Sequence, residues 1–241
     1  MKRASGDETK YSLLFKNKHF WYLVGLVTAD GSLSKDKRHI DITSKDKKYL
    51  EDLKTCFNLD NRVAMKNKNK KNVAYRIQLG SKLLWNFLYC IGLMPRKTHE
   101  LMSVNVPATK FRDFLRGFID GDGNIQSWIN NRNGHRQWSL RMKILSGAFA
   151  KWLCKATEYY VGAKGRLHLE SKENRQDIYV LKFGKLSARH ILKRCYYKGA
   201  FAYYRKRSLA LQCLSSETGW STHSSVLTKA PGCWNWHTVQ T

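Results

Sequence analysis

The sequence predicts an α+β fold made of two similar halves, each with the element order αββαββα and an antiparallel sheet. Three observations lead to this prediction. A helical segment that ends in Asp-Gly occurs twice, at residues 23–31 and 115–123. Each copy is followed by segments in which apolar and polar side chains alternate, as half-buried strands require. Segments with apolar residues at helical spacing separate and follow those strands.

The two halves carry matching landmarks in the same order, as a duplicated chain does. The offset between partners grows from 92 to 102, 104 and 109 residues. The matched segments are 23–31 with 115–123, 42–44 with 144–146, 75–80 with 179–184, and 96–97 with 205–206. Because the order never changes, the drift indicates loop insertions in a pseudo-two-fold duplicated unit of about 110 residues.

The clearest strand lies in the second half, where polar side chains alternate with apolar ones from Gln137 to Ile144. That period of two predicts one buried face and one basic face open to solvent or a ligand. Shorter alternating segments predict further inward-facing residues: Val63, Met65, Tyr75, Ile77, Leu79, Leu167 and Leu169. Helical stripes of core residues are expected at 50–57, 83–91 and 191–195.

This pattern divides the chain into four parts. Residues 1–103 form the N-terminal half, 104–110 a linker and 111–214 the C-terminal half, and no role is assigned to the neutral tail at 215–241. Pro107 lies where the helical periodicity is interrupted, and a proline in this position is typical of a helix start near Phe111.

The chain is strongly basic, with 44 Lys and Arg against 18 Asp and Glu and a formal net charge of +26 over 241 residues. Residues 1–110 contribute +12 and residues 111–214 contribute +14, so both halves share the charge. A field of this sign attracts polyanions and favours nucleic acid as the partner. The hydrophobic content of 42% excludes disorder as the main state. The longest uncharged apolar stretch, 20–29, is too short to span a membrane.

The residue types in the two Asp-Gly segments have a physical explanation. Gly25 and Gly117 lie in mid-helix, where glycine costs about 1 kcal/mol relative to alanine. Close packing of the two helices would offset that cost, so a helix interface at these glycines is expected; a merely tolerated glycine is the alternative. Such packing brings Asp30 and Asp122 together at the helix C-termini, where mutually repelling carboxylates favour a divalent cation. Two ordinary helix-capping turns are the alternative.

The two segments resemble the nine-residue LAGLIDADG motif of the homing endonucleases, and each matches it at six positions. The resemblance is to the single-chain, two-motif type and covers about residues 15–212. The eighth-position acid that the family's chemistry needs is present in both copies, as Asp30 and Asp122. The first copy departs from the motif at Val24, Val27 and Thr28, and the second at Arg116, Phe118 and Gly121.

The resemblance implies a function and a reaction. Members of the family bind long DNA targets with two antiparallel sheets that form a saddle across successive major grooves. They cut both strands across the minor groove and leave short 3′ overhangs. A site-specific endodeoxyribonuclease that hydrolyses phosphodiesters in a Mg²⁺-dependent reaction is therefore expected, intron-encoded and acting as a monomer on an asymmetric double-stranded DNA target.

The resemblance also implies site residues by position. Roughly two or three Mg²⁺ ions would be held by Asp30, Asp122, Gly31 and Gly123. The basic residues beside the acids, expected to be catalytic with them, are Lys97 and Lys206. The polar residues expected to order solvent are Ser44 and Ser146. Asp120 matches Thr28 of the first copy, so we interpret it as structural or peripheral.

DNA contacts are expected from outward-facing strand side chains and hairpin tips. Arginine pairs well with guanine and glutamine with adenine, whereas lysines mostly contact phosphates. The predicted DNA-binding residues are Arg38, Lys66, Lys68, Lys70, Arg76, Gln78, Gln126, Arg132, Gln137, Arg141, Lys143, Arg166 and Lys182.

Two other functions remain open from the sequence. An intron-splicing maturase would grip intron RNA with the same basic sheets, and a catalytically silent nucleic-acid-binding protein could have the same fold. Retention of both acids favours the nuclease. Six scattered cysteines without Cys-x-x-Cys pairs favour a reducing, intracellular compartment, cytoplasmic or organellar (mitochondrion or chloroplast) depending on the host.

Overall fold

The structure is a computed structural model that describes residues 11–66, 73–95, 97–171 and 176–216, without the side chains of residues 97 and 98. Lys68, Lys70 and most of the predicted tail lie outside the described residues. Within the described part, no helix is both long and apolar enough to cross a membrane.

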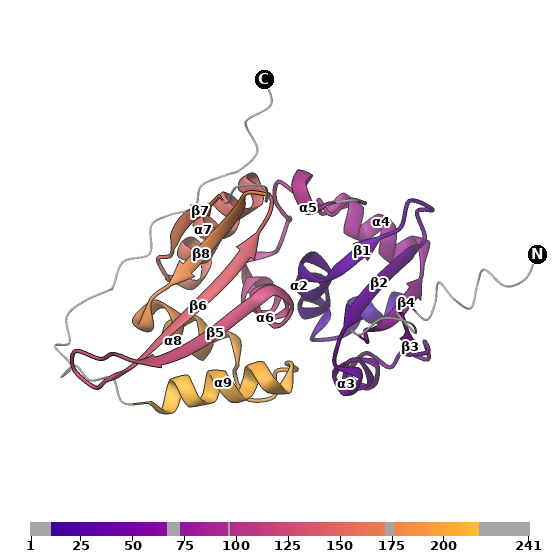
Figure 1. Cartoon of the computed structure of the whole chain (residues 1–241). Helices are drawn as coiled ribbons and strands as arrows, with labels where there is room; N and C mark the ends of the chain where they lie inside the picture. The colour runs from indigo at the N-terminus through magenta and orange to yellow at the C-terminus, as the bar shows by residue number, and fades with distance from the viewer. Residues whose placement is uncertain (1–10, 67–72, 96, 172–175, 217–241) are drawn as a thin grey trace, which may run out of the picture.

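Two helix–sheet units make up the described chain, and both follow the predicted αββαββα order (Figure 1). The N-terminal unit consists of α2 (Phe20–Ala29), β1 (Gly31–Leu33), β2 (His39–Ser44), α3 (Lys47–Phe57), β3 (Ala64–Met65), β4 (Tyr75–Gly80) and α4 (Lys82–Cys90). The short helices α5 (Lys97–Glu100) and η1 (Ala108–Lys110) connect it to the next unit. The C-terminal unit consists of α6 (Phe111–Asp122), β5 (Gly123–Ile129), β6 (Arg136–Ile144), α7 (Gly147–Val161), β7 (Arg166–Glu170), β8 (Ile178–Phe183), α8 (Lys185–Cys195) and α9 (Tyr204–Ser215).

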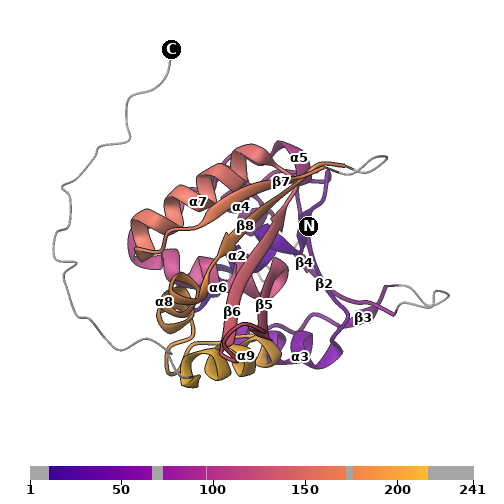
Figure 2. The same ribbon diagram turned by 60° about the vertical axis from the view of Figure 1, so that its left-hand side comes forward.

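The two sheets have the same antiparallel topology. Their strand orders are β1-β2-β4-β3 and β5-β6-β8-β7, which confirms the predicted α+β fold with a duplicated unit. Helices α3 and α4 pack on the first sheet, and α7 and α8 pack on the second (Figure 2). Helices α2 and α6 lie side by side between the sheets and join both units in one hydrophobic core.

Local sequence explains where several helices begin. The side chains of Asp46, Ser81 and Ser146 each accept a hydrogen bond from the backbone N–H three residues later, at the start of α3, α4 and α7. Such N-caps satisfy a donor that a helix leaves unpaired at its first turn. Ser44 supports the first of these caps, since its hydroxyl accepts from the N–H of Asp46.

The strand register corrects the predicted alignment of the halves. Gly31 pairs with Ile42 in the first sheet, and Gly123 pairs with Met142 in the second. Ile42 is therefore equivalent to Met142, at an offset of 100 residues and not 102. The capping residues Asp46 and Ser146 differ by the same 100 residues, so Ser146 corresponds to Asp46 and not to Ser44. The sequence alignment had paired Ser146 with Ser44, two positions before its true equivalent Asp46, because both are serines.

Three apolar residues that were expected in the core are exposed. Met65 is 44% exposed in the two-residue strand β3, and Leu169 is 53% exposed in β7. Both strands lie at sheet edges, where alternation does not guarantee that a helix covers the inward face. Leu83 is exposed near the start of α4, whereas Leu84 and Leu88 are buried.

Candidate active site

Helices α2 and α6 approach each other through a reciprocal pair of glycines. A Cβ atom on Gly117 would lie 2.8 Å from the backbone nitrogen of Leu26, and one on Gly25 would lie 2.9 Å from that of Phe118. Real Cβ atoms do not come this close to backbone, so each helix needs glycine where the other crosses it. The cost of glycine in a helix is thus offset by direct backbone packing.

The glycine contact fixes where the two acids emerge. Asp30 caps the C-terminus of α2 and Asp122 is the last residue of α6, and both side chains are exposed. The carboxylate of Asp30 lies over Gly121, since a Cβ there would be 3.3 Å from its Oδ2. Gly121 adjoins Asp122, so the structure places the two predicted acids at neighbouring helix ends. Gly31 and Gly123 follow them as buried first residues of β1 and β5.

These acids carry oxygen donors of the kind that a divalent cation takes. Among the side chains that the structure describes, no three His, Cys, Asp or Glu residues cluster as a metal site of their own. Mg²⁺ commonly binds proteins through only one or two carboxylates together with substrate phosphates. The exposed pair Asp30 and Asp122 fits that requirement.

Lys206 extends from the first turn of α9 towards the same acids. Its ammonium donates a hydrogen bond to the carbonyl oxygen of Gly123. Burial lowers the pKa of Lys206, against the opposing attraction of Asp120, Asp30 and Asp122. Lys206, one of the two predicted basic residues, therefore lies beside Gly123 and within the electrostatic influence of both acids. Lys97 is the first residue of α5, and its side chain lies outside the described part of the chain.

A buried carboxylate, Asp120, anchors the start of α9. Its Oδ2 accepts hydrogen bonds from the backbone N–H of Tyr203 at 2.6 Å and from the hydroxyl of Tyr22 at 2.8 Å. Its Oδ1 accepts from the hydroxyl of Tyr196 at 2.6 Å. Burial raises the pKa of Asp120 to about 6, and these hydrogen bonds work in the opposite direction. The structural interpretation of Asp120 thus gains a specific content, since its hydrogen bonds join α6 to α2 and to the approach to α9.

Asp46 holds the same end of α9 from the other half of the molecule. Its Oδ2 accepts from the hydroxyls of Tyr204 at 2.7 Å and Tyr203 at 3.1 Å, and lies 3.4 Å from Nε of Arg205. Figures 1 and 2 both show α9 beside α3, the helix that Asp46 caps. Although burial opposes the shift, the hydrogen bonds from Tyr204, the Tyr49 backbone and Tyr203 lower the pKa of Asp46.

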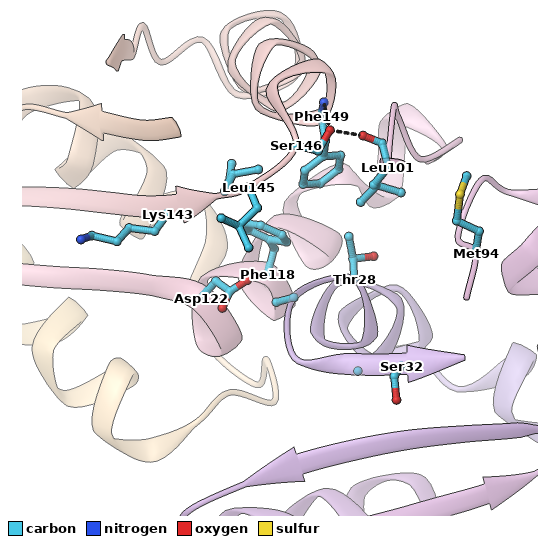
Figure 3. A pocket seen from close by; sticks show the side chains of 13 residues that line it. Thr28, Ser32, Met94, Leu101, Phe118, Asp122, Lys143, Leu145, Ser146 and Phe149 are labelled. Carbon is cyan, nitrogen blue, oxygen red and sulfur yellow. Dashed lines mark hydrogen bonds between the residues drawn. The ribbon is translucent and has the colours of Figure 1, made fainter. Parts of the chain in front are cut away.

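The other side of the α2–α6 pair contains a cavity of about 300 Å³ (Figure 3). Asp122 and Phe118 line it from α6, while Thr28 and Ser32 line it from the N-terminal unit. Ser146 closes one end, where its hydroxyl donates to the carbonyl oxygen of Leu101 at 2.5 Å. Because it is buried and already bonded to the backbone, Ser146 acts first as a cap for α7.

The open face of the C-terminal sheet carries a row of cations. Cross-strand pairing aligns Asn124, Arg141, Lys182 and Arg166 across β5, β6, β8 and β7. Residues that pair across strands point to the same face, so three positive groups form one line. Lys143, two residues beyond Arg141, is exposed and bonds Glu170 at 3.5 Å.

The equivalent face of the N-terminal sheet is more mixed in charge. Asp41 lies between Ser32 and Gln78 in the corresponding row. Arg76 forms an ion pair with Asp41 at 3.5 Å, and the exposed Lys66 donates to the hydroxyl of Thr43 at the same distance. Gln78 is exposed on this face.

The remaining predicted DNA contacts lie along the strands and turns. Gln126 and Gln137 are half-buried on β5 and β6, opposite Ser139 and Trp128. Arg38 and Arg132 are exposed in the turns that join β1 to β2 and β5 to β6. The structure therefore distributes the predicted contacts over both open sheet faces and their connecting turns.

Sequence reasoning missed Arg116 as a structural residue. Arg116 is fully buried, and its guanidinium bonds Asp113 at 2.7 Å and the carbonyl oxygens of Phe201 and Cys195. It thus connects α6 to the end of α8 and to the segment that leads into α9. Its departure from the apolar motif position was a signal that the residue had a specific partner. Tyr203 and Asp46 gave no comparable signal.

Comparisons with known proteins agree with this geometry. Residues 17–92 match the family model of the LAGLIDADG-like domain. No curated protein matches the chain.

Solved structures resemble the chain over most of its length. The homing endonuclease I-WcaI bound to its DNA recognition sequence has a TM-score of 0.56 at 12% identity, over 78% of this chain and 84% of its own. The LAGLIDADG homing endonuclease I-GzeII in complex with its DNA target has a TM-score of 0.52 at 14% identity, over 78% and 86%. Full-length DUF199/WhiA from Thermatoga maritima has a TM-score of 0.53 at 15% identity, over 87% and 65%.

The described chain consists of two units and has the fold of the solved homing endonucleases I-WcaI and I-GzeII. Both units carry the Asp-Gly helix and the same sheet, and the N-terminal unit contains the matched domain. The resemblance noted in the sequence is thus confirmed, by the LAGLIDADG-like domain model over residues 17–92 and by the shared fold over most of the chain.

Proposed function

We propose that this protein is a site-specific DNA endonuclease that makes a double-strand break in a long, asymmetric target by Mg²⁺-dependent phosphodiester hydrolysis. The observation that carries the proposal is that Asp30 and Asp122 lie at neighbouring helix ends, with Lys206 bonded to Gly123 beside them. A structural role would need neither a second exposed acid nor a half-buried lysine beside them.

Double-stranded DNA is the proposed partner. The homing endonucleases I-WcaI and I-GzeII, which share the fold, are bound to DNA targets. In this chain the row Arg141, Lys182 and Arg166 would face the duplex together with the open face of the first sheet. Lysine and arginine on such a surface neutralise phosphates, and arginine can also read guanine edges.

The chemistry is divided between the acids and the lysine. Asp30 and Asp122 would hold Mg²⁺, which supplies a more acidic water and stabilises charge on the phosphate and leaving oxygens. The ammonium of Lys206 lies close enough to the acids to attract the scissile phosphate and offset its charge. Its lowered pKa also makes its proton easier to transfer.

A cleavage selection tests the proposal directly. The protein is incubated with a randomised duplex library and Mg²⁺, and newly formed ends are sequenced. We expect one family of long sites cut on both strands, and no new ends when EDTA replaces Mg²⁺. Recovery of bound but intact duplexes would instead favour a catalytically silent DNA-binding protein. Preferential binding of structured RNA would favour a maturase.

Target binding should depend steeply on salt. The two halves carry net charges of +12 and +14. We therefore expect the logarithm of the binding constant to fall with the logarithm of salt concentration, with a slope equivalent to roughly six to ten neutralised phosphates. Fluorescence anisotropy between about 50 and 200 mM salt measures the slope, which should fall by about one for Arg166→Met. A slope near zero would contradict binding of DNA by the sheets.

The chain should act as a monomer on a non-palindromic site. The equivalent rows differ, with Asp41 and Gln78 in one half where Arg141 and Lys182 stand in the other. Different side chains read different bases, whereas a symmetric dimer would present identical surfaces to each half-site. The mass of the complex, measured in solution on a selected target of about twenty base pairs, should equal one chain per duplex. Two chains on a palindrome would contradict this.

A further inference from the structure

The start of α9 is held by contacts of Tyr203, three residues before Lys206. The N–H of Tyr203 donates to Asp120, and the Tyr203 hydroxyl donates to Asp46. The Tyr203 ring also packs on Tyr49, with ring centroids 4.4 Å apart. The backbone and the side chain of one residue are thus fixed from two halves of the molecule, three residues before the lysine.

Asp120 is the centre of this arrangement. It is only 4% exposed and accepts three hydrogen bonds, from α2, from the residue that follows α8 and from the approach to α9. The Tyr22 hydroxyl that bonds it also lies 2.6 Å from the hydroxyl of Tyr49. Removing the carboxylate would leave buried donors unpaired and release the α9 backbone.

The equivalent position in the first half makes a different contact. Thr28 occupies the position of Asp120, and its hydroxyl donates to the carbonyl oxygen of Val24 within the same helix, at 2.8 Å. Thr28 borders the 300 Å³ cavity, whereas Asp120 faces packed tyrosines. Figure 1 shows α5 and α9 at opposite sides of the α2–α6 pair. A change at Asp120 should therefore reach Lys206 and not the side of the site next to α5.

We propose that Asp120 is a positioning residue that holds the start of α9, and thereby places the Lys206 ammonium beside Asp30 and Asp122. The inference rests on the proposed endonuclease function for its catalytic meaning. Its structural content, the placement of Lys206, can be measured without cleavage. Asp120 does not contact the reacting atoms, and it acts through the Tyr203 backbone.

Amine reactivity measures the placement of Lys206. The full chain is acetylated sparingly with an N-hydroxysuccinimide ester, and modification of each lysine is followed by mass spectrometry. Each rate is divided by the neutral fraction of the amine, which the pH dependence of labelling gives, because burial lowers the pKa of Lys206 and raises that fraction. In the wild-type protein, the corrected rate should be lower for Lys206 than for the exposed Lys193 and Lys198, because its amine is half-buried and bonded to Gly123. In Asp120→Asn its rate relative to those lysines should rise about fivefold or more, as loss of one good hydrogen bond predicts.

Thr28→Val is the matched control. Thr28 occupies the equivalent buried position in α2, and its hydroxyl bonds the carbonyl oxygen of Val24 within the same helix. Its replacement should leave the relative rate of Lys206 unchanged. If Asp120→Asn does not fold, Tyr196→Phe removes one hydroxyl donor from Asp120 and should raise the Lys206 rate about twofold. An unchanged rate in a folded variant of either kind overturns the proposal.

Strand-resolved cleavage gives the second readout. On a selected duplex labelled on both strands, Lys206→Met identifies the strand that depends on this lysine. Asp120→Asn should slow the same strand at least tenfold more than the other, with unchanged DNA affinity, so that nicked duplex accumulates. Equal slowing of both strands contradicts the proposal. If the wild-type protein cuts neither strand, the endonuclease function fails, and the reactivity of Lys206 alone decides whether Asp120 positions it.

Discussion

Replacement of either acid by its amide, Asp30→Asn or Asp122→Asn, is expected to abolish double-strand cleavage while DNA binding persists. Each carboxylate lies at a helix end beside the other, and an amide removes the charge that a divalent cation requires. We expect the rate of double-strand cleavage to fall by at least about 100-fold, the scale of losing a key electrostatic contact in a transition state. Single-turnover assays on a selected target measure this rate.

The binding measurement separates this outcome from unfolding. Removing a negative charge near phosphate weakens repulsion, so the DNA affinity should stay equal or increase slightly. Asp52→Asn is a suitable control, because Asp52 is an exposed acid on α3 whose partner is Lys48. It should cut at the wild-type rate. Wild-type cleavage by Asp30→Asn or Asp122→Asn would show that the altered acid has no part in the reaction.

Gly117→Ala should destabilise the protein by about 3 kcal/mol, although alanine is the better helix former. The added Cβ would lie 2.8 Å from the backbone nitrogen of Leu26 and closer still to the carbonyl of Tyr22, and backbone cannot move aside as a flexible side chain can. The two helices must separate to accept it, which disturbs the core shared by both units. Urea unfolding, followed by the transition midpoint, measures the effect.

Gly184→Ala is the matched control for that substitution. Gly184 caps α8 at a φ of −73°, and a Cβ built there meets no atom within 4 Å. Its replacement should cost no more than about 1 kcal/mol, because alanine is a poorer N-cap than glycine but meets no clash here. If Gly117→Ala instead raised the midpoint, helix propensity would outweigh packing, and the close contact of α2 with α6 would be wrong.

Much of the fold was predictable because it depends on local periodicity and on repetition. Alternation from Gln137 to Ile144 predicted β6 with its buried side, and the Asp-Gly segments predicted the two helices that end at the acids. A second copy of each landmark strengthened each interpretation. Glycine in both helices was also informative, since only close packing explains a costly residue twice in register.

Features that depend on contacts between distant residues were not predictable. Asp46 and Tyr203 are 157 positions apart, and nothing near either residue indicates the hydrogen bond between them. The two-residue error in aligning 42–44 with 144–146 arose because short apolar strands resemble each other in several registers. The strand pairing in the structure resolved the register, because Gly31 pairs with Ile42 and Gly123 with Met142. Edge strands caused the errors at Met65 and Leu169, because the alternation rule assumes a covered face.

The chemical part of the site divides in the same way. Asp30 and Asp122 follow from the motif, and Lys206 follows from the repeated Arg-Lys pair. Asp120 was visible in the sequence, but its three buried donors come from segments about 80 to 100 residues away. A pattern of residue types cannot show whether such an acid supports a site or only fills space.

The most direct test follows both strands of one duplex after Mg²⁺ is added. The duplex most enriched by binding is labelled differently on its two strands, bound to excess protein without metal, and then given Mg²⁺. The paired acids predict that both strands are cut at fixed positions a few base pairs apart, and that EDTA prevents both cuts. A duplex that stays intact in the stable, salt-sensitive complex after Mg²⁺ is added would contradict an endonuclease and leave a DNA-binding protein built on this fold.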